Sequence, residues 1–242
     1  MIGYTANLLI PRMGEASRCV YMAKYEKQPF EKLFGTVIAE RVVDLLVLLL
    51  IMLFTIIIQF GTLEEYLIEV GFFEKFKGYK LYIILVLFFV GAFVFWKLIK
   101  SSSIKFFVKI RGFIGGILEG LKTIYTMKKK GAFLFYTIVI WVLYILMFYI
   151  AFFSLPDTSE VPIGGVISAF VIGSLSIAAT NGGIGAYPLG IQQILLLYNV
   201  GANEGLAFGW IVWVAQSGMI VLFGLLSIIL MPIFNRSNES IA

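Results

Sequence analysis

Long apolar runs separated by short polar stretches form the dominant pattern along this chain. A helix needs about 20 mostly apolar residues to cross a hydrocarbon core of roughly 30 Å. The short alternating strands of a transmembrane barrel are absent from the sequence. The pattern therefore predicts an all-α, polytopic helical membrane protein with about six spans plus interfacial or re-entrant helices. The expected spans cover residues 45–60, 81–96, 132–155, 163–179 and 206–231, with a shorter apolar piece at 189–200.

The stretch from Val161 to Ala202 carries no charged residue, yet it is too long for one helix. It is interrupted by Thr180-Asn181-Gly182-Gly183-Ile184-Gly185 and by Pro188. If 189–200 crosses the bilayer, both chain ends lie in the cytoplasm; if it is re-entrant, the tail lies outside. The glycines free the backbone to bend, and Asn181 is expected to satisfy exposed backbone groups. Two interpretations stay open: a break presenting amide donors to an anionic headgroup in a wet cavity, or a tight turn between helices.

Composition narrows the class of protein further. Of the 242 residues, 60% are hydrophobic and 14% are charged, whereas soluble chains carry about 25% charged residues. Histidine is absent and Cys19 is the only cysteine, which removes histidine-based catalysis, the usual zinc sites and an internal disulfide. The sequence has no P-loop and no Gly-x-Ser-x-Gly elbow. We therefore expect a protein that is not an enzyme, with no cofactor and no metal.

The net charge of +5 matters through its distribution and does not indicate nucleic acid. Basic residues concentrate before the first expected span and between Lys97 and Lys130. The positive-inside rule then places the N-terminal region and the 97–131 loop in the cytoplasm. Apolar residues at helical spacing within 101–131 predict an amphipathic helix in the inner interface, with a solvated basic linker as the alternative. The whole chain, 1–242, is expected to form one domain with a tail at 233–242.

Two short charged stretches are the main candidates for function. The first contains Arg12, Glu15 and Arg18 at a spacing of three, which places them on neighbouring positions of one helix face. The second contains Glu40, Arg41 and Asp44 and leads into the span expected from Leu45. Two carboxylates on one face repel unless cations lie nearby, and the three arginines are the candidates. At a membrane boundary, Asp44 must be paired or face water. The alternative is that these charges only anchor helix ends at the headgroups.

Pro-Arg-Met-Gly-Glu-Ala-Ser-Arg at 11–18, Glu-Arg-Val-Val-Asp at 40–44 and Gly-Gly-Ile-Gly at 182–185 resemble the motifs of the flippase-like, or lysylphosphatidylglycerol synthase transmembrane region, family. The resemblance implies a multi-pass plasma-membrane protein of a prokaryote that moves a lipid or lipid-linked headgroup between leaflets. Carried over position by position, the motif residues include Gly14 together with the charged and glycine residues quoted above. The expected substrate-binding residues are Arg12, Glu15, Arg18, Glu40, Arg41, Asp44, Asn181, Gly182, Gly183 and Gly185.

The sequence departs from the family pattern in three ways. Members usually carry further spans before the first motif, so this chain is expected to be truncated at its start. Many carry an acidic residue shortly after Gly-Gly-Ile-Gly, where this chain has Ala186, Tyr187 and Pro188. The best-known members flip aminoacylated phosphatidylglycerol made by a fused synthase domain, which does not follow Met231 here.

The lipid partner is therefore open: an anionic or aminoacylated phospholipid, or a polyprenyl-linked headgroup. The expected function is a lipid flippase or transporter. The alternative is a non-transporting membrane subunit of lipid or cell-envelope biosynthesis, with a separate synthase or an oligomer as partner.

Several uncharged polar side chains lie within apolar segments. Hydrogen bonds between helices are the expected role of Gln192, Gln193 and Gln216, in preference to substrate contact. Trp210 and Trp213 are expected to pack in the core or against lipid.

Overall fold

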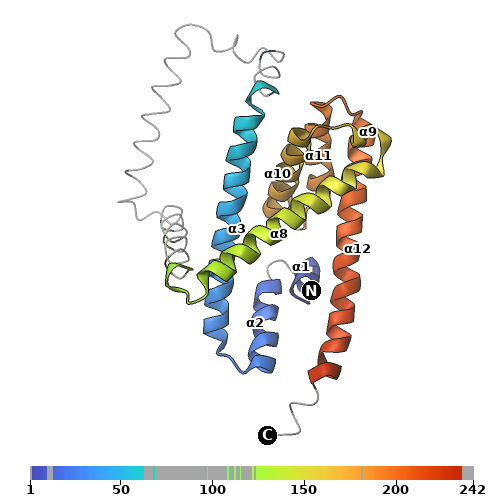
Figure 1. Ribbon diagram of the computed structural model, residues 1–242. Coiled ribbons are helices and arrows are strands. Elements are labelled where there is room, and N and C mark those ends of the chain that lie inside the picture. Colours follow the sequence, from blue (N-terminus) through green and yellow to red (C-terminus); the bar gives the residue numbers. More distant parts are fainter. Residues whose placement is uncertain are drawn as a thin grey trace.

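The structure is a computed structural model that describes residues 2–9, 13–62, 124–180 and 182–235, with isolated positions at 68, 97, 108, 112, 115 and 122. Within these residues it contains helices and no strand, which confirms the all-α prediction (Figure 1). The elements are α1 (Ile2–Leu9), α2 (Met13–Glu26), α3 (Phe30–Ile58), α8 (Lys130–Ala151), the 3-10 helix η1 (Phe152–Ser154), α9 (Pro156–Ser159), α10 (Ile163–Ala179), α11 (Ala186–Leu196) and α12 (Ala202–Asn235).

Three of the described helices are long and apolar enough to cross a membrane: Phe30–Ile58, Lys130–Ser154 and Ala202–Phe234. Their surfaces carry large apolar side chains that face outward, such as Leu50, Ile138 and Leu222. Contiguous exposed apolar surface of this extent is typical of a lipid-facing surface. The chain is thus an integral membrane protein. The span expected at 81–96, and most of the expected interfacial helix at 101–131, lie outside the described residues.

Helix α3 begins at Phe30, fifteen residues before the predicted start of the span at Leu45. Pro29 occupies the N-cap position, and no further proline interrupts the helix before Gln59. Helix boundaries are set by residues such as proline that interrupt the backbone hydrogen bonding, and not by the position where the sequence changes from polar to apolar. As a result, Glu40, Arg41 and Asp44 lie inside one continuous helix.

Two other predicted boundaries are wrong for related reasons. Helix α11 begins at Ala186, because Pro188 lies in its first turn, where amide hydrogens have no partner within the helix. Helix α12 passes through Pro232 to Asn235, beyond the end of the span predicted at 231. Proline has a helix-compatible φ, so near a helix end it mainly removes one hydrogen bond.

Helices α10 and α11 form a hairpin that packs on the first half of α12 (Figure 1). The Gln192 amide nitrogen donates to the Ala202 carbonyl at 3.0 Å, which confirms the expected interhelical role of this glutamine. Further along, a Cβ on Gly209 would lie 2.5 Å from the Pro188 Cα, so the two backbones are in close contact. Small residues allow helices to approach in this way within membranes.

The α10–α11 hairpin turns back at the glycine-rich segment. Eleven residues give α11 a length of about 16 Å, shorter than the roughly 30 Å hydrocarbon core of a bilayer. Helix α12 therefore starts at the α9 end of the bundle and finishes near the α2–α3 connection (Figure 1). The end of the described chain lies on the same side as that connection.

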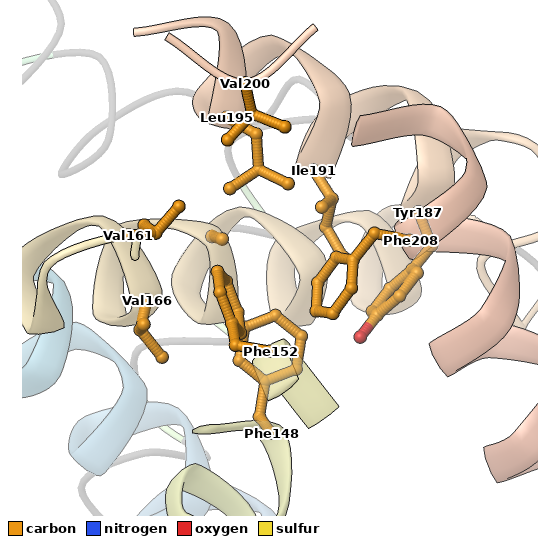
Figure 2. Close-up of a cluster of buried hydrophobic side chains, with 10 residues drawn as sticks. Phe148, Phe152, Val161, Val166, Tyr187, Ile191, Leu195, Val200 and Phe208 are labelled. Atoms are coloured by element: carbon orange, nitrogen blue, oxygen red, sulfur yellow. The ribbon is translucent and has the colours of Figure 1, made fainter. Parts of the chain in front are cut away.

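A buried apolar cluster fixes the hairpin against α8 and α12 (Figure 2). The Phe152 ring lies with its centroid 4.5 Å from that of Phe208. Tyr187 and Ile191 of α11 also belong to this cluster. Thr158 of α9 is buried, and its hydroxyl donates to the Phe152 carbonyl at 2.6 Å. Lipid is as apolar as these side chains, so their contribution comes mainly from close packing.

Helices α1 and α2 form a second hairpin, and α1 packs on the other half of α12. Ile2 and Ser227 line the same cavity, and the Thr5 hydroxyl donates to the Ile220 carbonyl at 3.2 Å. The two hairpins thus lie on successive segments of one long helix.

Candidate functional site

The structure brings Arg18 of α2 together with the three charged residues of α3. The Arg18 Nη1 atom lies 2.9 Å from Glu40 Oε2 and 3.1 Å from Glu40 Oε1. The Arg41 Nη2 atom lies 3.0 Å from Glu40 Oε1 and 3.0 Å from Asp44 Oδ2. The expected pairing of these carboxylates with Arg18 and Arg41 is confirmed. We call these four residues the charged cluster.

The charged cluster leaves donors available for a ligand. Among the described residues, each guanidinium uses one nitrogen for its ion pairs, although arginine carries five N–H donors. The Arg18 and Arg41 side chains are 50% and 48% exposed, whereas both carboxylates are 32% exposed. Their unused N–H groups are therefore accessible to an anion, and a planar guanidinium suits a phosphate.

Asp44 has a partner that the sequence did not indicate. The Trp141 indole nitrogen of α8 donates to Asp44 Oδ1 at 3.3 Å. The Trp141 ring also contacts the rings of Tyr144 and Phe170. The cluster is thereby connected to α8 and to the α10–α11 hairpin. Only the tertiary fold brings positions 44 and 141 together, so no local pattern predicts this pair.

A cavity of about 590 Å³ lies beside the charged cluster, between α1, α2, α3 and the second half of α12. Pockets of this size are large enough for a small organic ligand. Its polar lining consists of Tyr4, Asn7, Glu15, Arg18, Tyr21, Arg41 and Ser227, and its apolar lining includes Ile2, Met22, Val37, Leu230, Met231 and Phe234. Such a mixed lining fits a headgroup that carries an apolar tail.

Glu15 supplies an unused acceptor at the cavity wall. Its Oε2 atom is buried and has no hydrogen-bond partner among the described residues. A buried polar atom without a partner costs free energy and calls for an explanation. A ligand with an ammonium or hydroxyl donor would satisfy it.

Close backbone packing places Glu15 and Arg18 at the cavity. A Cβ on Gly14 would collide with the Gly3 carbonyl oxygen of α1 and with the Asn7 side chain. The Gly14 amide also donates to Asn7 Oδ1 at 2.6 Å. Only glycine permits this crossing of α1 over α2. Gly14 therefore acts on the site by setting the position of its neighbours.

The glycine-rich turn lies elsewhere and does not line the cavity. Gly182, Gly183 and Gly185 have φ values of 67°, 78° and 74°, which favour glycine. The Tyr187 amide donates to the Gly183 carbonyl at 2.8 Å, and the Leu189 amide donates to the Gly185 carbonyl at 3.2 Å. The described part of this segment is therefore a tight turn whose carbonyls accept the first hydrogen bonds of α11.

Trp213 of α12 fixes this turn, a role that the sequence did not indicate. Its indole nitrogen donates to the Gly182 carbonyl at 2.7 Å. Its ring also lies near Gly183, where an added Cβ would be 3.6 Å from that nitrogen. Two of the predicted site residues, Arg12 and Asn181, lie outside the described residues. The described members of the predicted site thus lie at two separate places. One is the cavity with its charged cluster, and the other is the glycine-rich turn between α10 and α11, which contacts α12.

A family model described as Lysylphosphatidylglycerol synthase TM region matches residues 1–224 of the chain. The match includes both charged stretches and the glycine-rich turn. No curated protein and no solved structure matches the chain significantly.

Proposed function

We propose that this chain, which belongs to the lysylphosphatidylglycerol synthase transmembrane region family, moves a phospholipid or lipid-linked headgroup between membrane leaflets. The observation that carries the proposal is a cavity of about 590 Å³ lined by Arg18, Arg41 and Glu15 within an apolar helical domain. Ionisable side chains inside membrane domains are costly and commonly mark substrate pathways.

In this proposal the two arginines hold the lipid phosphate. The exposed edges of the guanidinium groups donate to phosphate oxygens, and Glu40 and Asp44 hold the guanidinium groups in place. A partly exposed ion pair contributes only about 0–1 kcal/mol. The pair therefore positions Arg18 while adding little stability, and the phosphate binds the N–H groups that the pair leaves unused.

Glu15 gives the site a preference among headgroups. Its unpartnered oxygen accepts a hydrogen bond from an ammonium or hydroxyl group of the lipid. A headgroup that carries both a phosphate and such a donor satisfies the arginines and Glu15 together. The proposed substrate class is therefore a phospholipid whose headgroup includes an amine or hydroxyl.

The proposed orientation places the cavity on the cytoplasmic side of a plasma membrane. Lys24, Lys27 and Lys32 lie near the α2–α3 connection, and Lys128–Lys130 precede or begin α8 in the same half of the bundle (Figure 1). Asp157 and Glu160 lie at the opposite end, around α9. The positive-inside rule assigns the lysine-rich side to the cytoplasm.

The test is lipid translocation by the purified protein in liposomes. The lipids are fluorescent phosphatidylglycerol and phosphatidylethanolamine, and a membrane-impermeant reductant reports how fast the inner-leaflet label becomes accessible. We expect faster loss of fluorescence than in protein-free liposomes. No acceleration by folded, reconstituted protein contradicts the proposal and favours the non-transporting membrane subunit, in which the same ion pairs are structural.

A further inference from the structure

Two contacts delimit a central segment of α12 that has polar side chains. The turn of the α10–α11 hairpin reaches α12 at Trp213, and α1 reaches it at Ile220 and Gly224. Ile220 lies seven positions after Trp213, a distance of about 10 Å along the helix axis. The polar residues Gln216 and Ser217 lie within this segment.

Gln216 and Ser217 share a face of α12 with the residues that contact both hairpins. Ser217 lies four residues after Trp213 and seven before Gly224, and Gln216 lies three after Trp213. Helical periodicity places residues at these spacings on one side. The same face continues to Ser227, which lines the cavity. One side of α12 thus connects the cavity, Gln216 with Ser217, and the glycine-rich turn.

Neither side chain is satisfied within the described protein. No described residue hydrogen-bonds to the Gln216 amide, whereas the Gln192 amide makes such a bond. Ser217 also differs from other serines within helices. Hydroxyl side chains such as Ser168, Ser176 and Ser227 bond to the carbonyl four residues earlier, but no such bond is present for Ser217.

Half-buried polar groups near the middle of a long apolar helix are unfavourable without a partner. We propose that Gln216 and Ser217 form a second, transient binding site for the lipid headgroup, between the cavity and the glycine-rich turn. The proposal rests on the transport function proposed above. The ligand chemistry is the phosphate and hydroxyl groups of the headgroup, because the Gln216 amide and the Ser217 hydroxyl both donate hydrogen bonds.

The absence of charge at this second site suits a transient contact. The arginines of the cavity bind a phosphate through charge-assisted hydrogen bonds, which are about twice as strong as neutral ones. Neutral donors in the middle of the path bind the headgroup less tightly, so the headgroup dissociates and continues along the path. Helix α1 crosses the same face at Gly224, so passage from the cavity requires α1 to move aside.

The experiment compares translocation and binding in the double variant Gln216→Leu, Ser217→Ala. Its matched control is Gln193→Leu, Ser168→Ala, which removes an exposed glutamine of α11 and a serine that bonds within its helix. Translocation of fluorescent phosphatidylglycerol is measured in liposomes. Binding of short-chain phosphatidylglycerol is measured in detergent, and thermal stability is measured for both variants.

We expect the double variant to slow translocation by about tenfold, the effect of losing hydrogen bonds in the path. Its affinity for the short-chain lipid and its melting temperature should stay at or above those of the parent protein. The control should translocate at the parental rate. Unchanged translocation by the double variant overturns this inference alone, and a parallel loss of stability and rate assigns the two residues a structural role. A parent protein that translocates no lipid overturns the transport function itself and this inference with it.

Discussion

Arg18 donates from one guanidinium nitrogen to both carboxylate oxygens of Glu40, at 2.9 and 3.1 Å, across 22 positions of sequence. This contact joins the α1–α2 hairpin to α3 at the edge of the cavity. Glu40 also accepts from Arg41, so one carboxylate sets the positions of both arginines that line the cavity. The geometry of the proposed phosphate site therefore depends on Glu40.

Replacing Glu40 with Gln should slow lipid translocation with little loss of stability. The neutral amide keeps the shape of the side chain but no longer orients two guanidinium groups. Because the pair is partly exposed, the free energy of unfolding should change by about 1 kcal/mol or less. Translocation rate and melting temperature of the variant check this. Glu31→Gln, at an exposed position in the first turn of α3, is the control; equal rates in the two variants would contradict a functional role for Glu40.

Replacing Gly14 with Ala should loosen the α1–α2 hairpin. The new Cβ would collide with the Gly3 carbonyl, and overpacking of this kind costs about 1–3 kcal/mol. Melting temperature in detergent measures the effect. A Cβ on Gly35 of α3 would meet nothing within 4 Å, so Gly35→Ala should be neutral or slightly stabilising. Similar melting temperatures in the two variants would show that α1 does not pack on α2 as described.

Replacing Trp213 with Phe should destabilise the glycine-rich turn while keeping an aromatic ring at this position. The variant loses the hydrogen bond to the Gly182 carbonyl, worth about 1 kcal/mol. Amide hydrogen exchange at residues 182–187 should become faster. Trp210, whose ring is in edge contact with that of Trp213, provides the control variant Trp210→Phe. Slow exchange at the turn in both variants would be evidence against the Trp213 contact.

The single thiol, Cys19, should react slowly in the folded protein. Its side chain is fully buried in α2, and burial raises the pKa of the thiol above the ordinary value of 9.0. The folded state therefore holds this proton more tightly than the unfolded state. Its contribution to stability is present below pH 9 and is lost as the pH rises through the folded-state pKa. The rates of maleimide labelling of Cys19 in the native and the denatured protein at pH 7 check this prediction. Equal rates would contradict the described packing of α2.

Sequence reasoning found the helices and the charged residues because both depend on local signals. Apolar runs with proline and glycine at their ends predicted α10 correctly at 163–179. The spacing of Glu40 and Asp44 predicted a shared helix face, and the repulsion between two carboxylates there predicted the nearby arginines as partners. The start of α3 was missed because polar residues continue a helix as well as apolar ones when no breaker intervenes.

The remaining features depend on tertiary contacts that a single sequence does not encode locally. The Trp141–Asp44 and Trp213–Gly182 hydrogen bonds join distant positions. The sequence grouped the glycine-rich turn with the charged residues, whereas the structure places the turn away from the cavity. The role of Gly14 depends on how closely α1 crosses α2, which no spacing reveals.

The most direct test of the proposed function is translocation of fluorescent phosphatidylglycerol by the double variant Arg18→Ala, Arg41→Ala. Its control, Lys24→Ala, Lys32→Ala, also removes two cations, but from exposed positions outside the cavity lining. We expect the arginine variant to lose translocation by about tenfold or more, because each charge-assisted hydrogen bond to phosphate contributes about 1.5–3 kcal/mol. The lysine variant should match the parent protein. Translocation at the parental rate by a folded arginine variant would contradict the assignment of the cavity as the substrate site.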